Sequence, residues 1–302
     1  MSGVSGDGAI AWVEVRLTVP RDDLDTVEEA LHAAGAAAVT VAGADTEPNF
    51  EPGRVWASNG VTALFDAAAL PDDLEERLAL ALGGPVALET VPLQGEDWAH
   101  AWKRRFTAFP VGDRLWVRPS WVEEPAPEGR VEVVLDPGMA FGTGQHETTR
   151  LCLEWLDTHC DARQAPRLLD YGCGSGLLAI AAAKLGAGYV LAVDNDPLAV
   201  EATRSNAAAN GVADIIDTRP ADDGLADCAP FLRVVANILS HTLIDLRRLL
   251  TEATTPGGEI VLSGILAEQA ETVRSAYPGF TWVNEIQDGD WVRLDGVRAD
   301  TE

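Results

Sequence analysis

Hydrophobic and polar residues alternate strictly over residues 12–19, with Val13, Val15, Leu17 and Val19 on one side of the alternation. A period of two predicts a strand that buries one face. Beyond residue 23 apolar residues recur every three or four positions, as on one face of a helix. The pattern therefore predicts a strand followed by a helix.

The next hundred residues continue this order. Asp22 or Asp23 is placed to cap the first helix, and Gly35 is placed to end it. Strands are expected at Val39 and Val41 and at 61–65. A second helix over 72–82 and a closing strand over 86–91 then complete the βαββαβ order of a ferredoxin-like domain, a small split sheet with both helices on one face.

A glycine loop stands between an apolar run at 167–170 and an alanine-rich helical stretch at 177–185. Gly172, Gly174 and Gly176 lie where a strand passes into a helix. An adenosine-bearing cofactor approaches the backbone at such a point, because glycines carry no side chains to hold it away. The third glycine comes one residue too early for a dinucleotide fingerprint, which argues against NAD.

Further apolar runs predict a seven-stranded sheet. Helices fill most of the early gaps, so the early strands should be parallel with right-handed crossovers, and the last two runs should form an antiparallel hairpin at the edge. The seven runs lie at residues 167–170, 189–193, 213–217, 231–236, 258–264, 280–284 and 291–295.

Asp194 ends the second of these strands, 22 residues after Gly172. An acidic side chain at this distance from the glycines can accept hydrogen bonds from both ribose hydroxyls of a cofactor. The alternative for Asp194 is a cap for the helix over 197–210, although Asp196 is the stronger capping candidate.

Asn237 ends the fourth strand. Amine-directed methyltransferases carry Asn or Asp at this position, followed by two prolines and an aromatic residue, whereas Ile238, Leu239 and Ser240 follow it here. A side-chain carbonyl can accept a hydrogen bond from an amine and aim its lone pair at a methyl carbon. The alternative for Asn237 is a structural cap at the end of the strand.

The run from Leu135 to Thr149 contains three glycines and a proline and leads into a helix over 147–156. Its backbone amides, with Thr148 and Thr149, suit an anionic carboxylate such as that of methionine. The run could equally be a structural turn. His146 is ambiguous as a general base.

Length and composition limit the remaining possibilities. A chain of 302 residues with 47% hydrophobic residues can form two ordinary cores. Four cysteines without CxxC pairs indicate reduced thiols and no metal site. The first nine residues lack the features of a signal peptide, and no apolar run has membrane-spanning length, so we expect a cytoplasmic protein that does not bind membranes.

The formal charge of −26 disfavours direct nucleic-acid binding and favours a basic protein substrate. An acidic proteome or plain solubility is the alternative explanation of the charge. Trp98, Trp102, Trp116 and Trp121 are expected to pack between a linker and the catalytic domain, with aromatic substrate contacts as the alternative. Residues 123–129 should form an exposed loop.

The strand, Asp170 and the three glycines resemble the first motif of class I S-adenosylmethionine-dependent methyltransferases. With the 135–149 run, Asp194 and residues 237–239, nearly the whole chain resembles the methyltransferases of ribosomal large-subunit protein eleven, the PrmA family. The resemblance implies an α/β fold, a seven-stranded Rossmann-like class I methyltransferase domain preceded by an α+β ferredoxin-like domain. The domains would be 10–95 for substrate recognition, 96–130 for the Trp-rich linker and the start of the catalytic domain, and 131–302 for methyl transfer.

The resemblance also implies the reaction and its site. The enzyme would methylate the N-terminal amine and lysine ε-amines of that basic ribosomal protein, with S-adenosylmethionine as methyl donor and without a metal. Asn237 would orient the amine or the cofactor, and no general base is assigned. The implied cofactor-binding residues are Thr149, Gly172, Asp194 and Asn237, with Asp170, Gly174 and Phe141 from the same motifs.

Two other functions remain open on the sequence. The chain could be a lysine methyltransferase for another protein, or a methyltransferase for a small amine. It could also be a non-catalytic module that binds an adenosine ligand.

Overall fold

The computed structural model describes residues 12–20, 23–36, 38–43, 58–93, 107–136, 146–225, 227–228 and 230–300. The chain divides into two compact units, Met1–Phe106 and Thr107–Glu302. Trp98, Trp102 and Phe141 lie outside the described residues. No helix in the described part of the chain is both long enough and apolar enough to cross a membrane.

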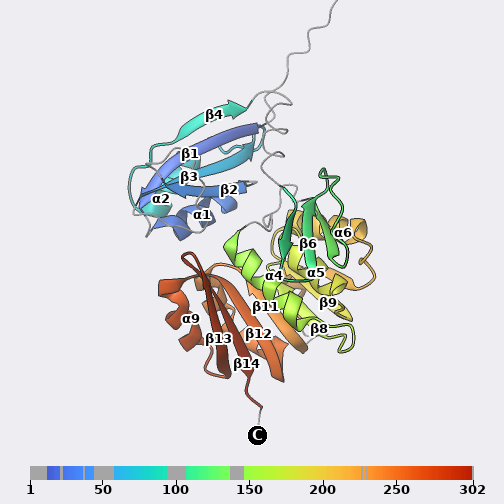
Figure 1. Ribbon diagram of the computed structural model, residues 1–302. Helices are drawn as coiled ribbons and strands as arrows, with labels where there is room; N and C mark the ends of the chain where they lie inside the picture. The colour runs from blue at the N-terminus through green and yellow to red at the C-terminus, as the bar shows by residue number, and fades with distance from the viewer. Residues whose placement is uncertain are drawn as a thin grey trace, which may run out of the picture. The chain divides into compact units, whose positions relative to one another are not determined.

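The first unit is a four-stranded antiparallel sheet with two helices on one face (Figure 1). The strand order is β2-β3-β1-β4, and the alternation in β1 buries its four aliphatic side chains beneath the helices. The ferredoxin-like prediction is therefore confirmed. The elements are β1 (Trp12–Pro20), α1 (Leu24–Ala33), β2 (Ala38–Gly43), β3 (Ser58–Asp66), α2 (Leu74–Leu82) and β4 (Glu89–Leu93).

Two details of this unit differ from the prediction. Asp23 precedes α1, but its side chain makes no capping hydrogen bond. The closing strand begins at Glu89 rather than at residue 86, because α2 ends in a left-handed Gly83 and is followed by Gly84 and Pro85. Proline has no N–H to donate to a ladder, so the chain rejoins the sheet only after this turn.

The second unit contains a seven-stranded sheet and a separate three-stranded one. Its elements are β5 (Phe109–Val111), β6 (Leu115–Pro119), β7 (Val131–Leu135), α4 (Glu147–His159), β8 (Arg167–Tyr171), α5 (Leu177–Lys184), β9 (Tyr189–Asp194), α6 (Pro197–Ala209), β10 (Ile216–Pro220), the 3₁₀ turn Ala221–Asp223, β11 (Phe231–Asn237), α7 (Ser240–Asp245), α8 (Arg247–Ala253), β12 (Thr254–Leu266), the 3₁₀ turn Ala267–Gln269, α9 (Ala270–Ala276), β13 (Phe280–Asp288) and β14 (Trp291–Arg298).

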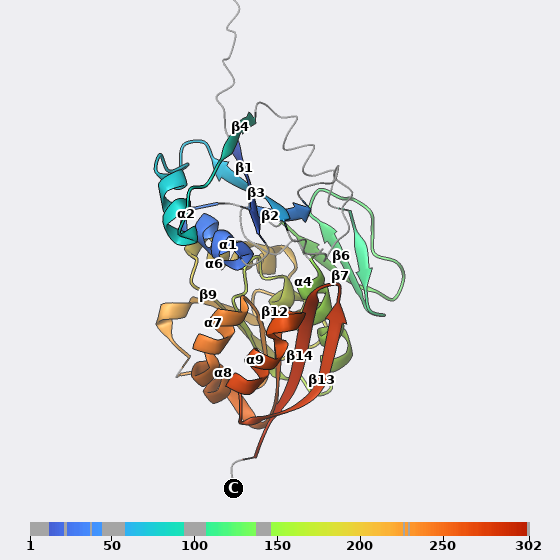
Figure 2. The same ribbon diagram turned by 90° about the vertical axis from the view of Figure 1, so that its left-hand side faces the viewer.

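The seven strands run in the order β10-β9-β8-β11-β12-β14-β13. The first five are parallel, and β14 lies antiparallel between β12 and β13, so the expected hairpin is confirmed. Helices α4, α5 and α6 pack on one face of this sheet. Helices α7, α8 and α9 lie together on the other face, as Figure 2 shows. This is the predicted α/β methyltransferase architecture.

Strand β10, the third strand of this sheet in chain order, begins at Ile216, three residues later than the predicted 213–217 run. Gly211 takes a φ of +69° after α6, and Ile215 and Ile216 both donate backbone hydrogen bonds to the carbonyl of Val212. Ala213 and Ile215 of the run therefore belong to a turn, and Ile216 begins the strand. The strand itself continues into polar positions, since β10 is at the edge of the sheet.

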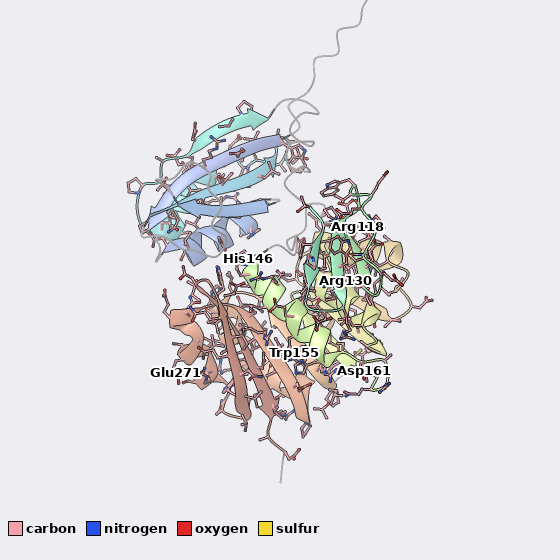
Figure 3. The ribbon with its side chains drawn as sticks, in the orientation of Figure 1. Arg118, Arg130, His146, Trp155, Asp161 and Glu271 are labelled. Carbon is pink, nitrogen blue, oxygen red and sulfur yellow. The ribbon has the colours of Figure 1, made fainter. Side chains whose placement is uncertain are left out.

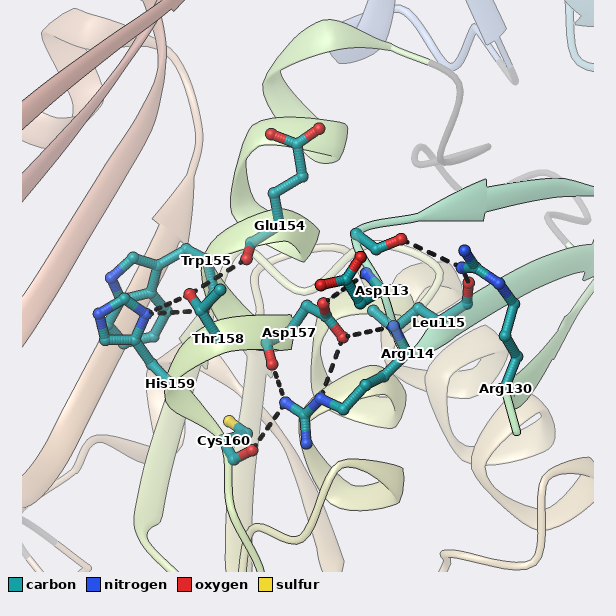
Figure 4. Close-up of polar contacts among 11 residues, drawn as sticks. Asp113, Arg114, Leu115, Arg130, Glu154, Trp155, Asp157, Thr158, His159 and Cys160 are labelled. Carbon is teal, nitrogen blue, oxygen red and sulfur yellow. Dashed lines mark hydrogen bonds and ion pairs between the residues drawn. The ribbon is translucent and has the colours of Figure 1, made fainter.

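The three-stranded sheet is attached to α4 by one carboxylate (Figure 4). Asp157 is 5% exposed and accepts hydrogen bonds from the backbone amides of Asp113 and Arg114, at 2.9 and 3.2 Å. The Arg114 guanidinium also reaches the carboxylate and the carbonyl of Cys160. These bonds hold the turn between β5 and β6 against the C-terminal half of α4.

Other expectations for this unit can be checked directly. Trp116 on β6 is buried, and residues 123–129 form the exposed loop that was expected. The four cysteines are all free thiols in buried positions, so none of them forms a disulfide.

Candidate functional site

The glycine loop joins β8 to α5 in a backbone path that favours glycine. Gly172, Gly174 and Gly176 have φ values of +79°, +53° and +83°, in the left-handed region that side chains disfavour. A Cβ on Gly172 would lie 2.3 Å from Cγ2 of Ile238, and one on Gly176 would lie 2.8 Å from Cγ2 of Thr203. Both conformation and space therefore require glycine at the first and third positions.

Asp194 holds this loop from the neighbouring strand. Its Oδ2 accepts a hydrogen bond of 2.8 Å from the Gly174 amide, and its Oδ1 accepts one of 3.0 Å from the Asp196 amide. Burial raises the pKa of Asp194 above its ordinary value. The cap of α6 is Asp196, whose carboxylate accepts a hydrogen bond of 2.8 Å from the Leu198 amide. The capping alternative for Asp194 is therefore wrong.

Asp170 is fully buried at the end of β8. Its Oδ2 accepts a hydrogen bond of 2.9 Å from the Ala179 amide in the first turn of α5. Its Oδ1 has no hydrogen-bond partner among the described residues. Desolvation raises the pKa of Asp170 to about 7. One oxygen of this buried carboxyl is hydrogen-bonded and the other has no partner among the described residues.

Asn237 and Thr149 meet at the same edge of the sheet. The Asn237 amide donates a hydrogen bond of 3.2 Å to the Thr149 hydroxyl, which lies buried in the first turn of α4. Strand β11 pairs in parallel with β8, with Ala236 opposite Tyr171. Asn237 therefore follows that last pair just as Gly172 does. The two strands bring the fourth-strand asparagine and the glycine loop together.

His146 begins α4, and Figure 3 shows it at the N-terminal end of that helix. Its Nδ1 accepts a hydrogen bond from the Thr148 amide at 3.3 Å and lies 2.9 Å from the Thr148 hydroxyl. Desolvation lowers the pKa of His146 to about 4, so the ring is neutral at pH 7. The residue is a helix cap and a weak base. Its Nδ1 accepts from the Thr148 amide, which was expected to be available to the carboxylate of a ligand.

Comparison with known proteins decides the family. Residues 11–299 match the family described as ribosomal protein L11 methyltransferase (PrmA). A protein of that name from Azotobacter vinelandii is 43% identical over 295 residues, which cover 95% of this chain and 99% of the relative. Another from Halorhodospira halophila is also 43% identical and is covered over its whole length.

The chain belongs to the ribosomal protein L11 methyltransferase family. It is therefore an enzyme of the methyltransferase class. A crystal structure described as ribosomal protein L11 methylase from Lactobacillus delbrueckii subsp. bulgaricus agrees with this fold. It has 32% sequence identity and a TM-score of 0.58, over 64% of this chain and 100% of that one.

Two side chains on α6 support the site of this family member, and the sequence analysis did not identify them. Thr203 donates a hydrogen bond of 2.9 Å to the Gly174 carbonyl. Asn206 is 3% exposed and donates to the carbonyls of Ser175 and Asp136, both at 2.9 Å, while its own carbonyl accepts from the Asp136 amide. The available signal in the sequence was an asparagine within the alanine-rich stretch of this helix, where a buried amide must find hydrogen-bond partners.

Proposed function

We propose that this enzyme transfers methyl groups from S-adenosylmethionine to ribosomal protein L11, at its N-terminal amine and at lysine ε-amines. The observation that carries the proposal is the convergence of the glycine loop, Asp194, Asn237 and Thr149 at the carboxyl edge of β8, β9 and β11. Ligands of open α/β sheets bind at that edge. Membership of the family supports the choice of substrate protein.

The residues at this edge fit the methyl donor. The Asp194 carboxylate accepts backbone hydrogen bonds from Gly174 and Asp196, and its two oxygens offer further lone pairs that we assign to the ribose hydroxyls. The positive φ of Gly172 and Gly174 keeps side chains out of the cofactor's path. We assign a second acceptor role to the unsatisfied Oδ1 of buried Asp170, at the end of β8 just before the loop. Thr149 and Phe141, from the 135–149 run, complete the proposed binding set.

The reaction needs alignment more than acid or base chemistry. S-adenosylmethionine supplies a methyl group already activated by its sulfonium. Because the Asn237 amide nitrogen donates to Thr149, the side-chain carbonyl oxygen is the atom that can accept a hydrogen bond from the amine or from the cofactor. Such an acceptor holds an amine for in-line attack.

The acceptor amine must be uncharged when it reacts. A lysine of pKa ~10.4 has to lose a proton first, and desolvation in a closed site favours that loss. With its pKa lowered to about 4 and its Nδ1 bonded to Thr148, His146 is a poor proton acceptor. We assign no general base and propose that water carries the proton away.

Substrate recognition is assigned to residues 10–95, the Trp-rich linker to 96–130 and methyl transfer to 131–302. The net charge of −26 favours a basic ribosomal protein over direct contact with nucleic acid. The proposed place of action is the cytoplasm. Deleting residues 1–95 should abolish methylation of L11, and unchanged activity would favour a different protein or a small amine as acceptor.

The direct test uses purified enzyme, isolated L11 and S-adenosylmethionine with a labelled methyl group. We expect label on L11, and mass spectrometry of its peptides should locate it at the N-terminus and at lysines. Asn237→Ala is the matched control and should transfer label more slowly than the wild type. Absence of transfer to L11 would contradict the proposal. Cofactor binding without labelling of any acceptor in a cell extract would support a non-catalytic binding module.

A further inference from the structure

The first strand of the N-terminal unit has a partly free edge. Strand β3 pairs with β1 along all of Trp12–Pro20, but β4 pairs with β1 only from Trp12 to Arg16. No other strand in the described part of the chain pairs with Leu17–Pro20 on the β4 side. Alternate residues of a strand direct their N–H and C=O groups to each side, so this stretch presents unpaired backbone groups.

The segment between α2 and β4 does not pair with this edge as a strand. The helix ends at Gly83, which has a φ of +69°, and Gly84 and Pro85 follow it. The chain pairs with β1 again only at Glu89, opposite Arg16. Residues 83–88 thus make no ladder pairs with the second half of β1, although Val86 and Leu88 pack against the core that contains Leu17 and Val19.

A cavity of about 690 Å³ lies between them. It is lined by residues 16–20 of β1, 60–62 of β3, Leu82 and 84–89, together with Asp23. Every lining residue belongs to the N-terminal unit. This volume falls in the range of cavities that hold specific ligands. A free strand edge along one wall makes the cavity suited to a polypeptide in extended conformation.

The charges around the cavity favour a basic occupant. Arg16 is the cation that lines it, and its guanidinium is bonded to Glu14 and lies 3.9 Å from Glu89. The carboxylates of Glu14, Glu89 and Asp23 therefore outnumber this one cation. Residues 1–93 as a whole contain sixteen Asp and Glu against four Arg, a net charge of −12. Such a field attracts positively charged segments and repels phosphates.

We propose that an extended basic segment of the protein substrate adds as a strand to the Leu17–Pro20 edge of β1 and fills this cavity. Backbone hydrogen bonds to the free edge would provide affinity, and the acidic rim would select lysine- or arginine-rich segments. The proposal rests on the proposed function, since it requires a protein substrate. Binding at a site built from the N-terminal unit alone affects substrate capture and leaves the methyl-transfer step unchanged.

The test fills the cavity with a side chain. Gly84 lines it, has a φ outside the left-handed region, and would have no atom within 4 Å of an added Cβ, so Gly84→Trp introduces bulk without backbone strain. Gly279, in the other unit, also has ordinary φ and open space, which makes Gly279→Trp the matched control. We expect Gly84→Trp to raise KM for L11 at least tenfold, with kcat and cofactor affinity unchanged. An unchanged KM would overturn the proposal.

Hydrogen exchange of the wild-type enzyme distinguishes strand addition from other contacts. Binding of L11 should slow exchange of the amides in Leu17–Val19, and Gly84→Trp should abolish that protection. If these amides stay unprotected in a saturated complex, the proposal is overturned. It is also overturned if they become protected without L11 as the enzyme concentration rises, because the occupant is then a second copy of this chain. If the wild-type enzyme transfers no label to L11, the proposed function itself is contradicted. If it labels L11 but the KM and hydrogen-exchange results are negative, only the docking site is refuted.

Discussion

The side-chain amide of Asn237 donates a hydrogen bond of 3.2 Å to the hydroxyl of Thr149, although 88 positions separate them in the sequence. This bond joins the end of β11 to the first turn of α4. It also fixes which atom of the asparagine is engaged, since the carbonyl oxygen remains as an acceptor. The two side chains should therefore behave as one unit.

A double-mutant cycle tests this coupling. Thr149→Val removes the acceptor at nearly constant volume and should lower kcat/KM about fivefold, equivalent to the ~1 kcal/mol of a typical hydrogen bond. Asn237→Ala should cost more, because it also removes the carbonyl that we propose orients the amine or the cofactor. The double variant should be no worse than Asn237→Ala alone. Additive losses would show that the two residues act independently.

The proposed ribose role of Asp194 can be tested separately from its observed hydrogen bond to the loop. Asp194→Ala should weaken cofactor binding by about 2–4 kcal/mol, because it removes charge-assisted hydrogen bonds. That loss also includes the bonds to the amides of Gly174 and Asp196. Calorimetry with S-adenosylhomocysteine and its 2′-deoxy analogue isolates the ribose part. The wild type should prefer the hydroxylated ligand, and Asp194→Ala should bind both equally weakly.

Gly172 faces Ile238 too closely to accept a side chain. Gly172→Ala should reduce cofactor affinity at least tenfold, because its Cβ would lie 2.3 Å from Cγ2 of Ile238 and because a φ of +79° costs alanine about 1–2 kcal/mol. Adding Ile238→Ala removes the clash and should restore part of the affinity in a binding titration. Ile238→Val keeps Cγ2 and should restore none, so equal rescue by both variants would refute the steric explanation.

The sequence was sufficient to predict the ferredoxin-like unit, the strands of the seven-stranded sheet and the edge where Gly172 and Asp194 meet, because these depend on local chemistry, whereas the three-stranded sheet β5–β7 was not predicted. Glycines at a strand end and an acidic residue at the next strand end have few alternative explanations, and parallel strands bring them together automatically. The register of β10 was harder to predict. Ala213 and Ile215 of the predicted run lie in the turn after Gly211, and the edge strand is mostly polar after its first residue, Ile216.

Contacts between distant segments could not be predicted in the same way. The bonds of Asn206 to the backbone of Asp136 and Ser175, and the contact of Ile238 with Gly172, depend on tertiary packing. His146 illustrates the same limit. Its residue type suggested a base, whereas its position before α4 makes it a cap whose pKa is lowered to about 4.

Asp170 makes the stability of the second unit depend on pH. Its folded pKa is raised to about 7 by desolvation, above the unfolded value near 3.9. A raised folded pKa gives stability that is fully present below the unfolded pKa and is lost as pH rises through the folded pKa. At 1.36 kcal/mol per pKa unit, the loss between about pH 4 and pH 7 is at most about 4 kcal/mol.

Asp170→Asn tests this directly, because asparagine keeps a carbonyl for the Ala179 amide and cannot ionise. Hydrogen exchange of the core amides of β8 and β9 measures the opening free energy at pH 5 and pH 8. The wild type should lose more stability between these values than Asp170→Asn does. Glu201→Gln removes an exposed carboxyl from α6 and should leave the wild-type pH dependence unchanged. If Asp170→Asn and the wild type lose equal stability, the carboxyl is already ionised at pH 5 and a bond to its Oδ1 must exist in solution.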